Sequence, residues 1–268
     1  MHFKKISFRK SFIHAAIDLA TAGAKFPILA KMWHRVMLRS RQLGKNDPFD
    51  AEEYRFLAKV LLDRHRSRSQ IFQDLWVLHE LGAKRNGYFV EFGAADGVYL
   101  SNTWLLEKEY GWKGILAEPA PPWHDALHRN RSAIISTECV SSTTGHRVLL
   151  RIPKNLAEYA TTSNDFLDSV HSDKFINFHE VQVCTISLVD LLKKYDAPKE
   201  IYYISMDVEG AEVEILESFD FDSYNIHLWS IEANNRQAYR VDRIMQDHGY
   251  ERCFKQFSLF DAWYRLKR

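Results

Sequence analysis

The stretch YFVEFGAADG at residues 88–97 decides the fold of this chain. Residues 88–92 predict a short apolar strand that ends in a glycine-rich turn, and Ser101 can cap a helix that runs to Gly111. The same pattern follows at once, with a strand at 114–118, a helix at 121–130 and a third strand at 133–140. Successive strand-helix units imply a parallel sheet.

Beyond residue 140 the alternation continues. Strands are predicted at 147–152, 181–186, 201–206 and 227–233, and helices from Ser187, after Glu212 and at 240–248. The segments 250–257 and 259–266 are joined too tightly for a crossover, so we expect them to pair antiparallel. The prediction is a Rossmann-like α/β fold with a mostly parallel sheet and an antiparallel C-terminal strand.

Helical spacing at 51–62 and 70–81 precedes this region, so we predict two parts. Residues 1–84 form a basic helical N-terminal extension, and residues 85–268 form the α/β domain. Composition agrees with a folded chain, because 46% of the 268 residues are hydrophobic and 26% are charged. The net charge of +1 argues against a nucleic-acid-binding protein.

Charge is unevenly distributed along the chain. Residues 1–45 hold ten basic residues and one acidic residue, a net charge of +9, which leaves −8 for the rest. Two interpretations stay open for this segment: peripheral contact with an anionic membrane, or an exposed basic helix or tail. No apolar run is long enough to span a membrane, and the three cysteines form no CxxC pair, which favours a cytoplasmic protein without a structural zinc.

Acidic residues follow three of the predicted strands. Glu91 and Asp96, Glu118, and Asp207 therefore meet at one edge of the sheet, where open α/β folds bind ligands. The first turn has Gly93 and Gly97 but lacks the third glycine of the dinucleotide fingerprint, and its carboxylates would repel a pyrophosphate. They suit a cationic ligand such as S-adenosyl-L-methionine. Glu118 can accept hydrogen bonds from the ribose hydroxyls, a role common to nicotinamide-dependent and methyl-donor-dependent enzymes.

Five motifs resemble those of the FkbM family of methyltransferases: EFGAADG at 91–97, SNT at 101–103, AEP at 117–119, SLVDLL at 187–192 and MDVEGAE at 206–212. The resemblance implies a class I Rossmann-like methyltransferase domain, S-adenosyl-L-methionine as donor, and O-methylation of a hydroxyl on a sugar, glycan or natural product. By the same resemblance, the donor would be bound by Glu91, Gly93, Ala94, Asp96, Gly97, Asn102, Glu118 and Ser141 or Ser142. Glu91, Gly93 and Asp96 would hold its amino-acid end, Glu118 its ribose, and Ser141 or Ser142 would lie near the adenine.

The chemistry is assigned to the turns after the fourth and fifth strands of the sheet. Asp207 is the candidate base for the acceptor hydroxyl, and Glu209, Glu232 and Asn234 would orient the acceptor. As an alternative, Asp207, Glu209 and Glu232 gather Mg²⁺ or another divalent cation that acidifies the hydroxyl. We expect Glu212 to cap a helix.

Two other functions stay open from the sequence. One is an NAD-dependent oxidoreductase, which the acidic turn and the missing glycine disfavour. The other is a catalytically silent partner-binding module, because a fold does not fix a function. The acceptor should be recognised by residues 141–180 and the helical extension, and the sequence does not give the oligomeric state.

Overall fold

The computed structural model describes residues 50–154, 157, 160–162, 178–208, 210–232 and 237–267. The chain divides into two compact units, residues 1–65 and 66–268. Within the first unit, helix α3 (Ala51–Asp63) begins at a capping box in which Asp50 accepts from the backbone of Glu53 and Glu53 accepts from the backbone of Asp50.

The second unit is built on a seven-stranded sheet in the order β3-β2-β1-β7-β8-β10-β9. All neighbours are parallel except β10, which runs antiparallel to both β8 and β9. This confirms the predicted mostly parallel sheet with an antiparallel strand at its C-terminal end. The strands are β1 (Tyr88–Phe92), β2 (Lys113–Ala117), β3 (Ile134–Ser136), β7 (Glu200–Met206), β8 (Asn225–Glu232), β9 (Tyr250–Cys253) and β10 (Asp261–Leu266).

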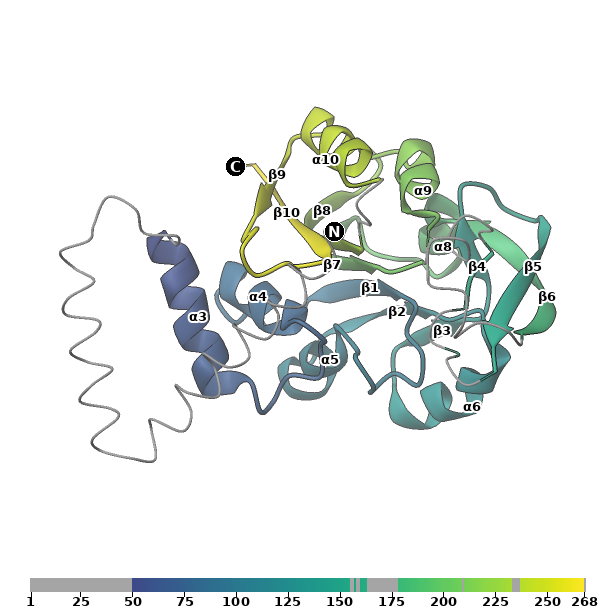
Figure 1. Cartoon of the computed structure of the whole chain (residues 1–268), viewed down its shortest axis with the longest axis horizontal. Helices are drawn as coiled ribbons and strands as arrows, with labels where there is room; N and C mark the ends of the chain where they lie inside the picture. Colours follow the sequence, from purple (N-terminus) through teal and green to yellow (C-terminus); the bar gives the residue numbers. More distant parts are fainter. Residues whose placement is uncertain are drawn as a thin grey trace, which may run out of the picture. The chain divides into compact units, whose positions relative to one another are not determined.

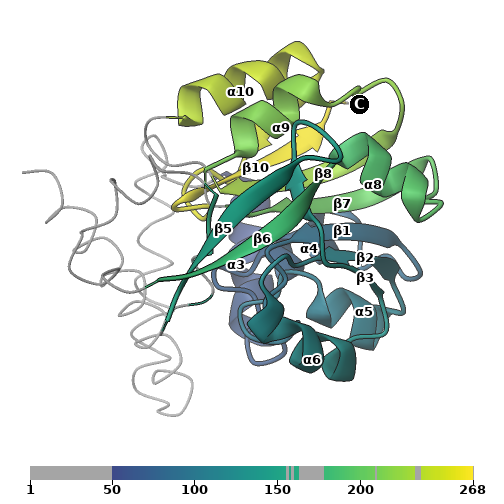
Figure 2. The same ribbon diagram turned by 90° about the vertical axis from the view of Figure 1, so that its right-hand side faces the viewer.

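Helices cover both faces of this sheet (Figures 1 and 2). One face carries α4 (Gln73–Glu80), α5 (Trp104–Tyr110) and α6 (Pro121–Asn130), and the other carries α8 (Leu188–Lys194), α9 (Glu212–Ser218) and α10 (Ala238–Asp247). The second group packs on the apolar side chains of β7 and β8, such as Ile204 and Trp229, which are fully buried. This arrangement is the three-layer solution that buries both faces of a parallel sheet.

Helix α4 belongs to the second unit, although the sequence analysis places it in the N-terminal extension. The division of the chain at His65 falls earlier than the boundary expected at residue 85. The physical reason is packing, because Trp76 of α4 is buried and stacks on Trp263 of β10 with ring centroids 4.9 Å apart.

Two predicted strands end early. The strand expected at 133–140 is divided into β3 and β4 (Cys139–Ser141), because polar Thr137 and Glu138 interrupt the apolar pattern. Strand β4 then pairs with β6 in a second sheet of order β4-β6-β5, formed with the antiparallel strands β5 (Arg147–Pro153) and β6 (Phe178–Ser187). The strand expected to reach Phe257 stops at Cys253, because Phe254 turns into the left-handed region at φ 49°.

Candidate active site

Two adjoining cavities lie at the carboxyl ends of β1, β2 and β7. The first, which we call the apolar cavity, encloses about 630 Å³, part of it open to solvent, and is lined by residues including Ala117, Pro119, Val140 and Leu150. The second, the acidic cavity, has a volume of about 670 Å³, part of it also open to solvent, and its lining includes four carboxyl side chains: Glu91, Glu118, Asp207 and Asp261. Phe92, Gly93, Glu118 and Asp207 line both. No Lys, Arg or His is among the described residues that line either cavity.

Gly93 is required at the junction of the two cavities. Its φ of 71° lies in the left-handed region, and a Cβ atom there would lie 2.6 Å from the backbone oxygen of Asp207. Its own N–H donates to the carbonyl of Ala117 at 3.0 Å. The turn after β1 can therefore pass close to β7 only as glycine, which leaves an open cradle between them.

Glu118 is buried and points back toward the turn after β1. Oε2 accepts from the backbone N–H of Ala95 at 2.8 Å, and Oε1 accepts from that of Ala120 at 2.8 Å. Each carboxylate oxygen retains a lone pair for a ligand hydroxyl. Burial raises the pKa of Glu118 to about 7, against the opposing effect of the two N–H groups.

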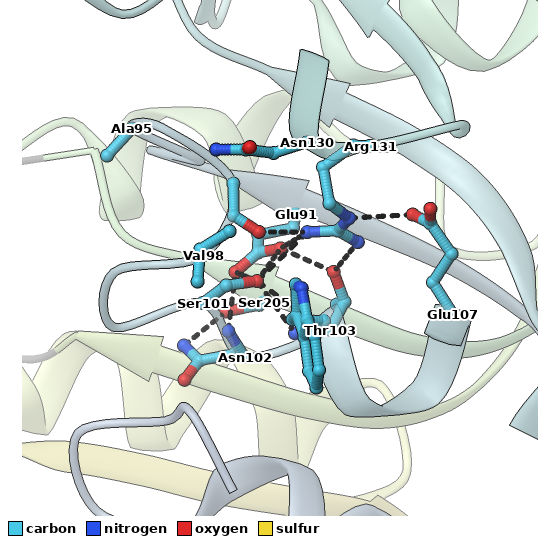
Figure 3. A network of polar contacts seen from close by, with 12 residues as sticks. Glu91, Ala95, Val98, Ser101, Asn102, Thr103, Glu107, Asn130, Arg131 and Ser205 are labelled. Carbon is cyan, nitrogen blue, oxygen red and sulfur yellow. Dashed lines mark hydrogen bonds and ion pairs between the residues drawn. The ribbon is translucent and has the colours of Figure 1, made fainter. Parts of the chain in front are cut away.

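Glu91 is buried in a polar network that holds the loop after it (Figure 3). Its carboxylate accepts from the Ser101 hydroxyl at 3.1 Å, from the Asn102 backbone N–H at 2.6 Å and from the Thr103 hydroxyl. Arg131 lies 3.6 Å away in an ion pair. Protein donors thus surround the carboxylate, so the geometry gives Glu91 a part in shaping the loop in addition to lining the acidic cavity.

Arg131, which follows α6, is the centre of this network, and the sequence analysis does not find it. Its guanidinium donates to Glu107 at 2.7 Å, to the carbonyl of Gly97 at 3.0 Å and to the Thr103 hydroxyl at 2.8 Å, and it is 5% exposed. A Cβ on Gly97 would lie 2.5 Å from the Cγ atom of Arg131, so the close packing of this arginine requires glycine at position 97. No local motif marks such a residue, because its partners lie 24 to 34 residues away.

Two other residues of this turn that the sequence predicts to bind the methyl donor lie outside both cavities. Asp96 accepts from the backbone N–H groups of Val98 at 2.8 Å and Tyr99 at 2.7 Å, which caps the turn, and it lines neither cavity. Ala94 is buried and also lies outside both linings, whereas Ala95 lines the acidic cavity.

Asn102 lines the acidic cavity and presents an unsatisfied acceptor. Its Nδ2 donates to the Ser205 hydroxyl at 2.9 Å, which fixes the amide. Its Oδ1 atom is buried without a hydrogen-bond partner among the described residues. A buried acceptor of this kind is uncommon and marks a place where a ligand N–H or O–H would be stabilised.

Ser141 and Ser142, expected near the adenine, are not among the lining residues of either cavity. The apolar cavity is bordered instead by Cys139 and Val140 of β4, by Leu150 of β5, and by Ala157 and Ala160 from the segment after it. The reason is the early end of β3, which moves residues 139–141 into the second sheet.

Asp207, at the end of β7, is the carboxyl shared by both cavities. Its side chain interacts with that of Glu232, and this interaction lowers the pKa of Asp207. Although Asp207 opens to the cavity, the surrounding protein displaces enough water to raise its pKa, and the charge of Glu91 raises it further. Two of the predicted catalytic residues therefore meet, while Glu209 and Asn234 lie outside the described residues.

The divalent-cation alternative gains no support. Within the described part of the chain, no three His, Cys, Asp or Glu side chains form a group that could hold a metal ion. Glu212, expected to cap a helix, accepts from the backbone N–H groups of Gly210 at 3.1 Å and Val208 at 3.4 Å. It therefore holds the turn that carries Asp207.

The basic segment 1–45 lies outside the described residues, so the two interpretations of it stay predictions. Across the described ranges from residue 50 onward, no helix combines the length and the apolar content that crossing a bilayer needs.

Comparison with known proteins gives one family. The Methyltransferase FkbM domain matches residues 91–252. "Methyltransferase 1" of Beauveria bassiana (strain ARSEF 2860) is 26% identical over 156 residues, which cover 53% of this chain and 61% of that protein, so the chain spans less than two thirds of this relative.

Two solved methyltransferase structures show a weak likeness to the chain. A precorrin-6y C5,15-methyltransferase from Geobacter metallireducens GS-15 has 11% identity and a TM-score of 0.37, over 73% of this chain and 87% of that one. The methyltransferase PaMTH1 of Podospora anserina, solved with bound SAH, has 10% identity and a TM-score of 0.37, over 89% and 96%.

Proposed function

Because the chain belongs to the FkbM methyltransferase family, we propose that it transfers a methyl group from S-adenosyl-L-methionine to a hydroxyl of a sugar, glycan or natural-product acceptor. The observation that carries the proposal is the acidic cavity, where Glu118 and Asp207 face a space with no cationic side chain among its described lining residues. A ligand with a sulfonium and an ammonium group supplies the missing positive charge.

The residues present fit this donor. Gly93 leaves the cradle that a Cβ would fill, and Glu118 has lone pairs for ribose hydroxyls beside it. The apolar cavity next to Glu118, lined by side chains such as Val140 and Leu150, suits an adenine ring. The orphan Oδ1 of Asn102 suits an ammonium N–H. A pyrophosphate would meet the same carboxylates unfavourably, and the family match gives no support to the oxidoreductase alternative.

For the reaction we assign the proton transfer to Asp207. When bound, S-adenosyl-L-methionine supplies a methyl carbon on a positively charged sulfur, and an acceptor oxygen replaces the sulfur on that carbon. Asp207 accepts the hydroxyl proton as the new bond forms, and its raised pKa makes it a stronger base. Glu232 fixes the orientation of Asp207 through the interaction of their side chains. Holding the oxygen in line with the methyl group supplies the rest of the acceleration.

Titration calorimetry with S-adenosylmethionine, S-adenosylhomocysteine and NAD tests the donor assignment. We expect micromolar binding of the two adenosyl ligands and none of NAD. Absence of adenosyl binding would reject the proposal, and adenosyl binding without transfer of labelled methyl groups to any hydroxyl-bearing acceptor would favour the silent module.

Asp207→Asn tests the base. General-base catalysis is worth about 10²–10⁴ in rate, so we expect turnover to fall at least 100-fold while the affinity for S-adenosylhomocysteine changes less than about threefold. Asp125→Asn, on the exposed surface of α6, is the matched control and should behave like the wild type. Full turnover in Asp207→Asn would remove Asp207 from the mechanism.

A further inference from the structure

One wall of the acidic cavity comes from outside the region that matches the family. Gln73, the first residue of α4, and Asp261, the first residue of β10, both line this cavity. The family match covers residues 91–252, so the two residues come from opposite flanks of it. Neither lines the apolar cavity, whereas Gly93, Glu118 and Asp207 line both. The pair therefore lines the part of the acidic cavity that is not shared with the apolar cavity.

The pair is built rigidly. Gln73 and Asp261 are 3% and 6% exposed, and Nε2 of Gln73 donates to Oδ2 of Asp261 at 2.9 Å. Oε1 of Gln73 accepts from the backbone N–H of Ile71 at 3.1 Å, so both ends of the amide are fixed. Stacking of Trp76 on Trp263 at 4.9 Å ties the same two elements together. Trp263 also interacts with the Asp261 carboxyl, and a second Nε2 hydrogen of Gln73 and a lone pair of Asp261 are left for a ligand.

Asp261 also lies beside the reacting groups. It is the register partner of Glu232 in the antiparallel pair of β10 and β8, and the side chain of Glu232 interacts with that of Asp207. Phe260 also lines this cavity, so the cavity offers an apolar ring in addition to the carboxyl group and the amide, whereas the Ser230 hydroxyl is engaged with the Tyr203 hydroxyl at 2.6 Å. Polar groups of both kinds next to an aromatic face suit a polyhydroxylated ligand.

We propose that Gln73 and Asp261 form the acceptor subsite, in which Asp261 accepts a hydrogen bond from a hydroxyl adjacent to the one that is methylated, and that the acceptor is a neutral sugar or polyol. The inference rests on the proposed function and names its substrate class. An acceptor that carries a carboxylate or phosphate at this position would be repelled by Asp207 and Asp261. Gln73 is a positioning residue, because it holds the Asp261 carboxyl in place.

The experiment uses the full chain saturated with S-adenosylhomocysteine and a matched pair of probes, methyl glucoside and methyl glucuronide, which differ by a carboxylate. Binding is titrated by saturation-transfer NMR. In the wild type we expect methyl glucoside to bind at least tenfold more tightly than methyl glucuronide. Asp261→Asn keeps an oxygen for Gln73, and we expect it to weaken glucoside binding about tenfold and to reduce the discrimination against the glucuronide.

Two further variants control for folding. Asp242 accepts a hydrogen bond from the Tyr264 hydroxyl of β10 at 2.6 Å and does not line the cavity. The Asp242→Asn variant therefore changes a carboxyl that contacts β10 outside the subsite, and it should bind both probes like the wild type. Gln73→Met keeps the side-chain length but removes the hydrogen bond to Asp261, so it should also weaken glucoside binding. It provides the test if Asp261→Asn does not fold. In each folded variant, affinity for S-adenosylhomocysteine should stay within about threefold.

The outcomes separate the two proposals. Loss of S-adenosylhomocysteine affinity in Asp261→Asn, with Asp242→Asn unaffected, would assign the pair to the donor and overturn the acceptor subsite. Absence of glucoside binding to the loaded wild type, tighter binding of the glucuronide, or unchanged glucoside binding in both Asp261→Asn and Gln73→Met would overturn it as well. A wild type that does not bind S-adenosylhomocysteine would instead reject the proposed function.

Discussion

Glu118→Gln makes a sharp test of the donor site, because the structure fixes what the substitution removes. In the wild type the two carboxylate oxygens accept from the N–H groups of Ala95 and Ala120, both at 2.8 Å. In glutamine one oxygen becomes an NH₂ group that faces a backbone N–H. A buried donor left without an acceptor costs about 1–3 kcal/mol, so we expect the free energy of unfolding to fall by that amount.

Donor affinity should fall independently of this loss. A hydrogen bond to a charged acceptor contributes about 1.5–3 kcal/mol, so loss of the charged acceptor for the ribose should raise the Kd for S-adenosylhomocysteine about 10- to 150-fold. Because burial raises the pKa of Glu118 to about 7 and ribose hydroxyls favour the charged form, wild-type affinity should weaken as the pH falls below 7, by at most tenfold per pH unit. The variant should lack this dependence.

The assay is calorimetric titration of both proteins with S-adenosylhomocysteine from pH 5.5 to 8.5. Glu212→Gln is the matched control, because burial also raises the pKa of Glu212 to about 7 and its carboxylate accepts two backbone N–H groups, but it lines neither cavity. Both N–H groups donate to the same oxygen, Oε1, which the glutamine amide oxygen can replace, so this variant removes a buried charge and should keep donor affinity within about threefold. Unchanged affinity and pH dependence in Glu118→Gln would refute the ribose assignment.

Three further predictions concern the frame of the site. Gly93→Ala adds a Cβ atom 2.6 Å from the Asp207 carbonyl, so it should weaken S-adenosylhomocysteine binding more than tenfold. Gly145→Ala, at φ 87° with nothing within 4 Å, isolates the backbone strain and should leave binding unchanged. Arg131→Met leaves Glu91 buried without its ion pair, so urea denaturation should show a loss of about 3–5 kcal/mol, and a loss below about 1 kcal/mol would contradict the network. The ligand-free protein should be less stable at pH 8 than at pH 5. The pKa of Glu118 is about 7 in the folded state against an ordinary value of 4.5, so its protonation contributes about 3 kcal/mol to the free energy of unfolding below pH 4.5, and this contribution is lost as the pH rises to 7. Denaturation midpoints that stay unchanged or rise between pH 5 and pH 8 would contradict this prediction.

The elements that the sequence predicts best are those set by local patterns. Strand β1 and helix α6 begin and end at the predicted residues, because an apolar run ending in a glycine turn, and Pro121 at a helix start, are local signals. Ser187 caps α8 as expected, accepting from the N–H of Asp190 at 3.2 Å. In the strand expected at 133–140, polar Thr137 and Glu138 mark the interruption, but the sequence could not show that Cys139–Ser141 joins a second sheet, because this depends on pairing with the distant strand β6.

The candidate site follows the same rule. Glu118, Asp207 and Gly93 can be found from sequence because each directly follows a strand, and the ends of parallel strands converge at one edge. Arg131 and the Gln73–Asp261 pair cannot, because their contacts join residues that are 24 to 188 positions apart and lie in segments with ordinary helix or strand patterns. Asp96 shows the converse case, in which a carboxylate in the right motif caps its own turn.

The distribution of charge explains why one buried carboxylate is a structural group while others can serve a ligand. Glu91 is paired with Arg131 and surrounded by hydroxyl and N–H donors, so its charge is compensated within the protein. Burial raises the pKa of Glu118 to about 7 and that of Asp207 above its ordinary value, and the described cavity lining gives these two no cation. A bound cation would favour their charged forms and release protons. Donor binding should therefore stabilise the protein most above pH 7, where the ligand-free site carries its largest uncompensated charge.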